Sequence, residues 1–107
     1  HGVVSVASHL AGSAISKMIK AYFAGDVAGA RDIHLKLFPL FKAMFITSNP
    51  MPVKTALRMF GMKVGGFRLP MSEMPDDARA SLKKALEAGV ADGLIDEALL
   101  SNPNREV

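Results

Sequence analysis

The sequence predicts a mainly α-helical protein with one short strand at its N-terminus. Apolar residues recur at helical spacing through most of the chain, glycines and prolines divide these stretches into four or five helices, and only the first few residues have a strand-like composition. With 107 residues, 50% of them hydrophobic and 21% charged, the chain has the size and composition of one globular domain. Disordered and collagen-like classes are therefore excluded, and so is a complete (β/α)8 barrel, which needs roughly 200 residues or more.

The segment that predicts the strand is Val3-Val4-Ser5-Val6-Ala7-Ser8. It is short, β-branched and almost continuously apolar, which is typical of a parallel strand buried on both faces. A parallel strand needs neighbours, and no other segment has a strand pattern. We therefore expect it to be the edge of a sheet that the chain lacks, or to pair with a second copy of itself.

Two helices are expected next. The first runs from Ser13 to Ala24, because its apolar residues recur at i, i+3, i+4, i+7 and i+8, and Gly25 stops it. Asp26 should cap the second helix, within which Pro39 removes one backbone hydrogen bond. The apolar side of the second helix consists of Val27, Ala30, Ile33, Leu37, Leu40, Phe41, Met44 and Phe45.

Proline and glycine delimit the remaining helices. Asn49 is the expected N-cap of the third helix, with Pro50 at its first position and Gly61 after its end. An irregular connector with Gly65, Gly66 and Pro70 follows. The fourth helix should start with Pro75, Asp76 and Asp77 in its first turn and end at Gly89; a short fifth is expected from Leu94 to Leu100, and the tail from Asn102 to Val107 should fray.

Composition restricts the class of partner. The 13 basic and 10 acidic residues give a net charge of +3, but the basic residues are spread along the chain, so we expect no nucleic-acid partner. No cysteine is present, which excludes disulfides and thiolate chemistry. No apolar run of about 18 residues is found, so we expect no membrane partner. The absence of cysteine and of a leader before Gly2 favours a cytoplasmic protein. A start at His1, directly before Gly2, suggests a chain cut from something longer.

The residues alone show no catalytic constellation. His1, His9 and His34 have no partner at ligand spacing, so no metal site is expected, and no serine lies in a Gly-x-Ser-x-Gly elbow. The adjacent Asp76 and Asp77 fit helix capping rather than acid–base catalysis. The methionines and phenylalanines lie mostly on helix stripes, where they are core or interface residues rather than cofactor contacts.

Three segments nevertheless carry a family resemblance. The chain contains three such segments in the following order: Gly2–His9 followed by a helix, the motif Asn49-Pro50-Met51-Pro52-Val53-Lys54, and Arg68-Leu69-Pro70. They resemble the eighth barrel strand, the Asn-Pro-x-Pro-Val-Lys motif and the Arg-Leu-Pro motif of the dihydrodipicolinate synthase (4-hydroxy-tetrahydrodipicolinate synthase) family. The resemblance covers roughly residues 1 to 90, and the tail from Ala91 onward has no family counterpart.

The resemblance implies a fold and an activity. Residues 1–25 would be the last strand and helix of a (β/α)8 TIM barrel, and residues 26–107 the C-terminal helical domain. The family is a class I aldolase-type lyase that condenses pyruvate with aspartate semialdehyde through a lysine Schiff base, in lysine and diaminopimelate biosynthesis, and it forms homodimers or homotetramers. Its Schiff-base lysine and tyrosine relay lie upstream and match no residue of this chain, so we expect no catalytic residue, no cofactor and no metal, and an inactive isolated chain.

One candidate site residue carries over from the resemblance. Val4 matches the position of a branched apolar residue beside bound pyruvate, where isoleucine is commoner; the alternative is that Val4 only fills the barrel core. Two other functions stay open: a non-catalytic helical module that self-associates, and the same segment of another pyruvate-dependent aldolase such as an N-acetylneuraminate lyase. Because Val3, Val4, Val6 and one side of the stripe from Ile15 to Phe23 would be uncovered without a barrel, we also expect self-association through the first two helices.

Overall fold

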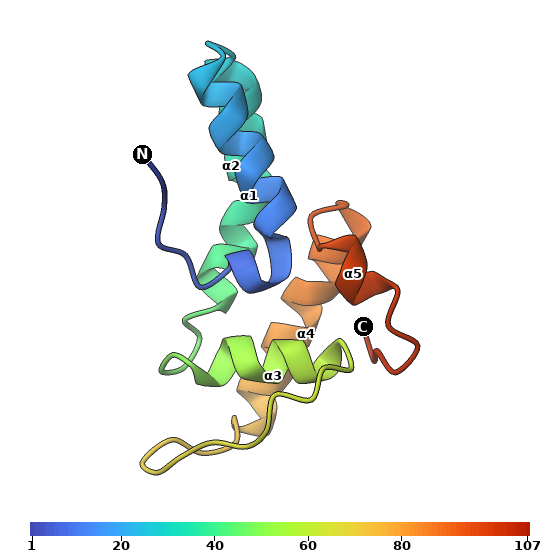
Figure 1. Cartoon of the computed structure of the whole chain (residues 1–107). Coiled ribbons are helices and arrows are strands. Elements are labelled where there is room, and N and C mark those ends of the chain that lie inside the picture. The colour runs from blue at the N-terminus through green and yellow to red at the C-terminus, as the bar shows by residue number, and fades with distance from the viewer.

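The computed structural model describes all 107 residues as a helical protein without strands. The mainly α-helical prediction is confirmed. Figure 1 shows α1 in front of α2, the two forming a hairpin, with α3 crossing below them and α4 passing obliquely behind α3. The five helices are α1 (Ser8–Phe23), α2 (Val27–Ala43), α3 (Met51–Met59), α4 (Asp76–Ala91) and α5 (Glu97–Leu100).

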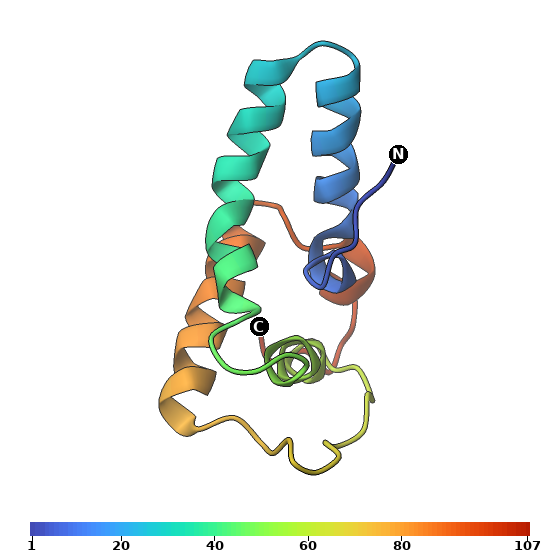
Figure 2. The same ribbon diagram turned by 90° about the vertical axis from the view of Figure 1, so that its left-hand side faces the viewer.

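The core lies where the lower part of the α1–α2 hairpin meets α3 and α4. Side chains from four helices and from the C-cap of α3 are fully buried there: Leu10, Leu37, Leu40, Met59, Phe60, Leu82 and Leu86. The free end of the hairpin is much less buried than this region. Of residues 18–30, which form this end, only Ala30 is buried. Figure 2 shows this end projecting beyond the other helices. The hairpin is therefore anchored at one end and exposed at the other.

The predicted N-terminal strand is wrong for this structure. Residues 1–5 have no regular secondary structure, Val6 and Ala7 form a turn, and α1 begins at Ser8. The amide of Ser8 donates to Ser5 Oγ at 3.1 Å, and Ser8 Oγ donates to the Ser5 carbonyl at 2.8 Å. The physical reason is that a strand needs a partner for its backbone groups, and no other segment of the chain supplies one.

Helix α1 starts five residues before the predicted Ser13, and it is not continuous. Ala11 has φ −133° and ψ 35°, which separates one turn at Ser8 from the longer part of the helix. The predicted end is confirmed, since Gly25 follows with φ 87°. The predicted cap of α2 is also confirmed, because Asp26 Oδ1 accepts from the Gly29 amide at 2.9 Å.

Several predicted helix ends are corrected. Asn49 is not the cap of α3: Pro50 holds that position without a side-chain hydrogen bond. Pro75 is the N-cap of α4 rather than part of its first turn, although Asp76 and Asp77 are in that turn as expected. Gly89 does not end α4 but lies buried inside it, where a Cβ would be 3.4 Å from Ile95 Cδ1. A Cβ there would make an ordinary van der Waals contact, so the segment that carries Ile95 packs directly against this turn of α4.

The C-terminal residues pack back onto the helices, so the predicted fraying is wrong. The fifth helix is limited to Glu97–Leu100, and the chain then turns toward α3. The Glu106 amide donates to the Met59 carbonyl at 2.6 Å, and Arg79 Nη2 lies 3.6 Å from Glu106 Oε2. These bonds, together with the partly buried Val107, hold the tail against α3 and α4.

Candidate functional site

The candidate substrate-binding residue Val4 lies in the extended N-terminal segment. Its side chain is fully exposed, and the neighbouring Val3 is 60% exposed. Because residues 1–5 pair with no strand, nothing in this chain encloses Val4 on the side where a substrate would lie. The structure therefore neither builds a pyruvate pocket at Val4 nor buries Val4 as core.

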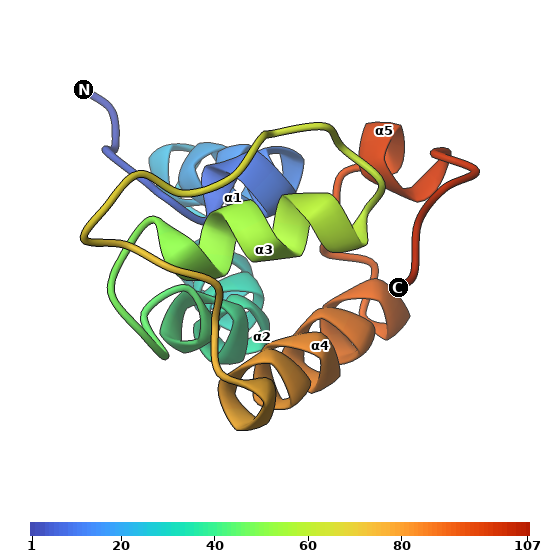
Figure 3. The same cartoon turned by 90° about the horizontal axis from the view of Figure 1, so that it is seen from below.

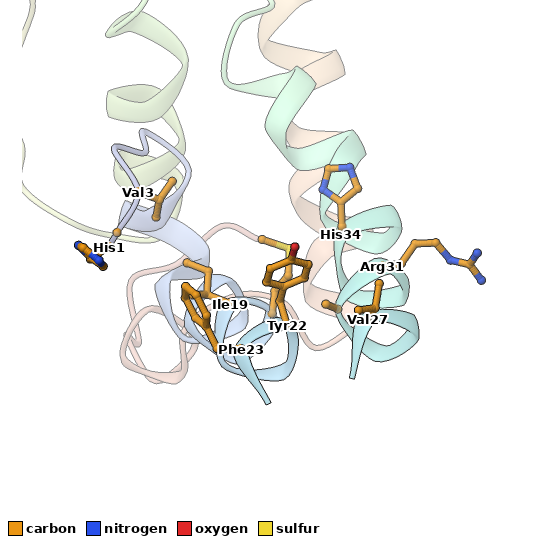
Figure 4. A pocket seen from close by; sticks show the side chains of 11 residues that line it. His1, Val3, Ile19, Tyr22, Phe23, Val27, Arg31 and His34 are labelled. Atoms are coloured by element: carbon orange, nitrogen blue, oxygen red, sulfur yellow. The ribbon is translucent and has the colours of Figure 1, made fainter. Parts of the chain in front are cut away.

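A groove lies beside this segment, between the exposed halves of α1 and α2. Its volume is about 580 Å³. Figure 4 shows Tyr22 between Ile19 and Phe23 of α1 on one side and Val27 and His34 of α2 on the other, with Val3 near the N-terminus and Arg31 pointing outward. The lining consists mainly of apolar side chains: His1, Gly2, Val3, Met18, Ile19, Tyr22, Phe23, Val27, Ala30, Arg31 and His34.

The chemistry of this groove suits packing rather than catalysis. Its lining side chains include no carboxylate and no lysine amine, and the polar side chains are two imidazoles, one phenol and one guanidinium. These side chains therefore supply neither a Schiff-base lysine nor a carboxylate acid–base pair. Exposed apolar side chains that gather in one groove mark a protein or membrane contact or a ligand-binding groove. The sequence signal for it was the stripe that continues to Tyr22 and Phe23 at the end of α1.

The motif at residues 49–54 contacts the connector at Gly66 and Phe67, just before the second motif at residues 68–70. The connector from residue 62 to residue 75 runs back along α3 before it joins α4 (Figure 3). Lys54 Nζ donates to the Gly66 carbonyl and lies 5.2 Å from the centre of the Phe67 ring. The bonds formed by Lys54 are thus structural: this lysine ties the connector to α3.

A second residue of α3 holds the same connector. Arg58 Nη1 donates to both carboxylate oxygens of Glu73, at 2.7 and 3.0 Å. Arg68 and Leu69, by contrast, are exposed, and Leu69 is 92% exposed. The part of the connector that carries the Arg-Leu-Pro sequence therefore faces away from the core.

The three histidines do not meet. His34 packs beside the rings of Phe38 and Phe41, at centroid distances of 6.0 and 6.1 Å. His1 lines the groove, and His9 lies at the start of α1. No group of three or more histidine, aspartate or glutamate side chains is placed to hold a metal ion. None of the five helices combines the length and the apolar character needed to cross a membrane.

The sequence matches one protein family over most of its length. The profile of the "Dihydrodipicolinate synthetase family" matches residues 1–89. The chain is 54% identical over 86 residues to 4-hydroxy-tetrahydrodipicolinate synthase of Nostoc punctiforme and 51% identical over 88 residues to that of Heliobacterium modesticaldum. These matches cover 80% and 82% of this chain but only 29% of each relative.

Solved structures of similar proteins agree with the sequence matches. Dihydrodipicolinate synthase from Cyanidioschyzon merolae, solved with lysine bound, superposes with a TM-score of 0.81 at 41% identity, over 83% of this chain and 30% of that chain. The 4-hydroxy-tetrahydrodipicolinate synthase of Methylacidiphilum fumariolicum gives a TM-score of 0.82 at 37% identity, over 92% of this chain and 33% of that chain. The chain thus spans about a third of the length of these relatives.

Proposed function

The chain belongs to the dihydrodipicolinate synthetase family, and on that basis we propose that it is the C-terminal segment of a 4-hydroxy-tetrahydrodipicolinate synthase. The complete enzyme is a lyase of lysine and diaminopimelate biosynthesis that condenses pyruvate with aspartate semialdehyde. Two observations together carry the proposal. Residues 1–89 match the family profile, and the chain is 54% and 51% identical to two relatives while covering only 29% of the length of each. Assembly of the complete enzyme as a homodimer or homotetramer is part of the proposal.

The proposed division of the chain follows the hairpin. Residues 1–25 would supply the last strand and helix of a TIM barrel, and residues 26–107 the C-terminal helical domain. The boundary falls at Gly25, in the turn between α1 and α2. The exposed N-terminal valines support this division, because a barrel wall needs apolar side chains on both faces of each strand. In the complete enzyme the segment 1–5 would pair with neighbouring strands, which this chain does not contain.

The apolar groove between α1 and α2 fits the same proposal. Ile19, Tyr22 and Phe23 belong to the helix that would pack on the outside of the barrel. A surface of such side chains is stabilised when another polypeptide covers it, by about 25 cal/mol for each Å² of apolar area removed from water. We propose that the barrel portion of the complete enzyme covers at least the Val3 side of this groove.

The isolated chain is expected to be inactive. Schiff-base catalysis needs a desolvated lysine amine that condenses with the pyruvate carbonyl and releases water. Lys17, Lys20 and Lys84 are exposed, and Lys54 is engaged with the connector. An exposed lysine amine lacks the desolvated pocket that activates a Schiff-base lysine. Incubation with pyruvate and borohydride, followed by mass spectrometry, should leave the mass of the chain unchanged, whereas the complete enzyme of Nostoc punctiforme should gain one reduced adduct. A stoichiometric adduct on one lysine of this chain would contradict the proposal.

Val4 is proposed to contact pyruvate in the complete enzyme. The test uses a chimera in which this chain replaces the matching C-terminal part of the Nostoc punctiforme enzyme. Successive side chains of a strand point to opposite faces, so Val3 is the matched control for Val4. We expect Val4→Phe to raise the KM for pyruvate about tenfold or more, because the ring occupies substrate space, and Val3→Phe to change this KM little. An equal effect of both substitutions would assign Val4 to the barrel core alone.

A further inference from the structure

Asp96 joins the C-terminal segment to the break in helix α1. Its Oδ2 atom accepts from the Gly12 amide at 3.1 Å, and its Oδ1 atom accepts from the Ser13 amide at 2.9 Å. The backbone amide of Asp96 donates to the Leu10 carbonyl at 2.8 Å. Asp96, which is half-buried, therefore bonds to three backbone groups around Ala11. In the sequence it follows Gly12 by 84 residues.

The three bonded groups are those that a helix break exposes. In a continuous helix the amides of Gly12 and Ser13 bond to the carbonyls four residues before them, and the Leu10 carbonyl accepts from the amide four residues after it. The dihedral angles of Ala11 interrupt this pattern. A carboxylate that accepts from the first amides of a helix is the usual N-cap, but in α1 a distant residue supplies it. Asp96 thus caps the longer part of α1, which starts after the break.

The residue preferences at the break oppose each other, so the local sequence does not by itself select the broken form. Alanine is the best helix former, and Ala11 has no intrinsic reason to leave the helical region. Gly12 works in the opposite direction, because glycine disfavours a helix interior. A Cβ at residue 12 would lie in ordinary van der Waals contact with Oδ2 of Asp96, at 3.4 Å, so the approach of Asp96 does not itself require glycine. The contact with Asp96 is therefore in a position to decide between the two conformations.

The segment that carries Asp96 is itself firmly attached. We define residues 92–107 as the terminal strap. Leu94, Ile95 and Leu99 of the strap are buried in the core, and its end is bonded to Met59. Figure 1 shows the strap, with α5, beside the lower end of α1. The family profile ends at residue 89, before the strap begins.

We propose that Asp96 holds α1 in its broken form, so that the terminal strap fixes the position of the turn from Ser5 to Ala11. Without the carboxylate, the residues around Ala11 close into a continuous helix and this turn rotates with it. Under the proposed function the turn would be the junction between the last barrel strand and its helix, at the end of the barrel where such enzymes hold their active sites. That consequence rests on the proposed function, whereas the capping by Asp96 does not.

The test compares three variants of this 107-residue chain by NMR. Asp96→Ala removes both side-chain acceptors, Asp96→Asn keeps one, and Asp92→Asn is the control, because Asp92 is an exposed carboxylate in the same strap. The readout is the coupling between the amide and α protons of Ala11, which is large for a φ of −133° and small for a helix. We expect the helical value in Asp96→Ala, an intermediate value in Asp96→Asn, and the unchanged large value in Asp92→Asn.

Three other outcomes would count against the proposal. A large Ala11 coupling in folded Asp96→Ala would show that the break does not depend on the carboxylate. If that variant does not fold, an unchanged coupling in Asp96→Asn overturns the proposal and an intermediate one supports it. Unfolding of both variants would also contradict it, because a cap that only places α1 does not hold the whole fold together. None of these readouts depends on catalytic activity, so they stand apart from a failure of the proposed function.

Discussion

Replacing Phe60 with alanine should cause one of the largest losses of stability that a single truncation can produce in this protein. Phe60 is completely buried at the C-cap of α3, in contact with the common core of the helices. Its removal loses transfer free energy and leaves a cavity, and such substitutions typically lower the free energy of unfolding by about 3–5 kcal/mol. A small domain has only about 5–15 kcal/mol in total, so a large share of the stability would be lost.

The measurement is urea unfolding followed by circular dichroism, with Phe45→Ala as the matched control. Phe45 is 63% exposed just beyond the end of α2, so its truncation should change the unfolding free energy by less than about 0.5 kcal/mol. Both substitutions remove the same atoms, and only burial differs. Similar losses in the two variants would contradict the placement of the core between the hairpin and α3.

The second large effect concerns self-association of the isolated chain. Val3, Val4, Tyr22, Phe23 and Val27 are all more than half exposed, and most of them line the groove between α1 and α2. Apolar patches beyond a few hundred Å² are rare on soluble monomers. We therefore expect light scattering to show dimers or larger oligomers at micromolar concentration, with the exposed halves of α1 and α2 in the contact.

Charge placed on this surface should abolish the association. Phe23→Lys combined with Val27→Lys puts two cations where the partner would pack, and burial of unpaired charge is strongly unfavourable. Leu69→Lys is the control, because Leu69 is even more exposed but lies on the connector rather than at the groove. We expect the double variant to be monomeric and the control to associate as the parent chain does. A clean monomer of the parent chain would contradict this prediction.

Local signals in the sequence predicted most of the helices. The stripe ending at Phe23, the glycine at position 25 and the capping Asp26 place the hairpin correctly, because helix packing and termination depend on neighbouring residues. The N-terminal strand was predicted wrongly from equally clear local signals. Its β-branched pattern is real, but a strand depends on a partner, and the chain has none.

The features that sequence reasoning missed depend mostly on distant contacts. The start of α1 at Ser8 follows from a local bond to Ser5, but the break at Ala11 involves Asp96, which no spacing rule connects to it. The tail was expected to fray because it is polar, yet Glu106 finds the Met59 carbonyl.

The candidate site was predictable only in part. Val4 came from resemblance alone, because no local pattern distinguishes a substrate contact from barrel-core filling. The exposed stripe follows from helical spacing, and Tyr22 and Phe23 are exposed as expected. Ile15, however, is buried and Val6 is partly buried, because the strap and the other helices cover the lower end of α1. Which part of a stripe is covered depends on the tertiary arrangement, and the spacing of residues does not carry that information.

The distance along the chain between helix α1 and its cap has a consequence for synthesis on the ribosome. Gly12 leaves the ribosome 84 residues before Asp96, which corresponds to roughly 4–17 s at about 5–20 residues per second. Short helices form in about a microsecond, so the residues of α1 can sample their conformations many times before the strap exists. The nascent helix α1 therefore stays uncapped during this time. Asp96 can fix the break at Ala11 only after translation has passed residue 96.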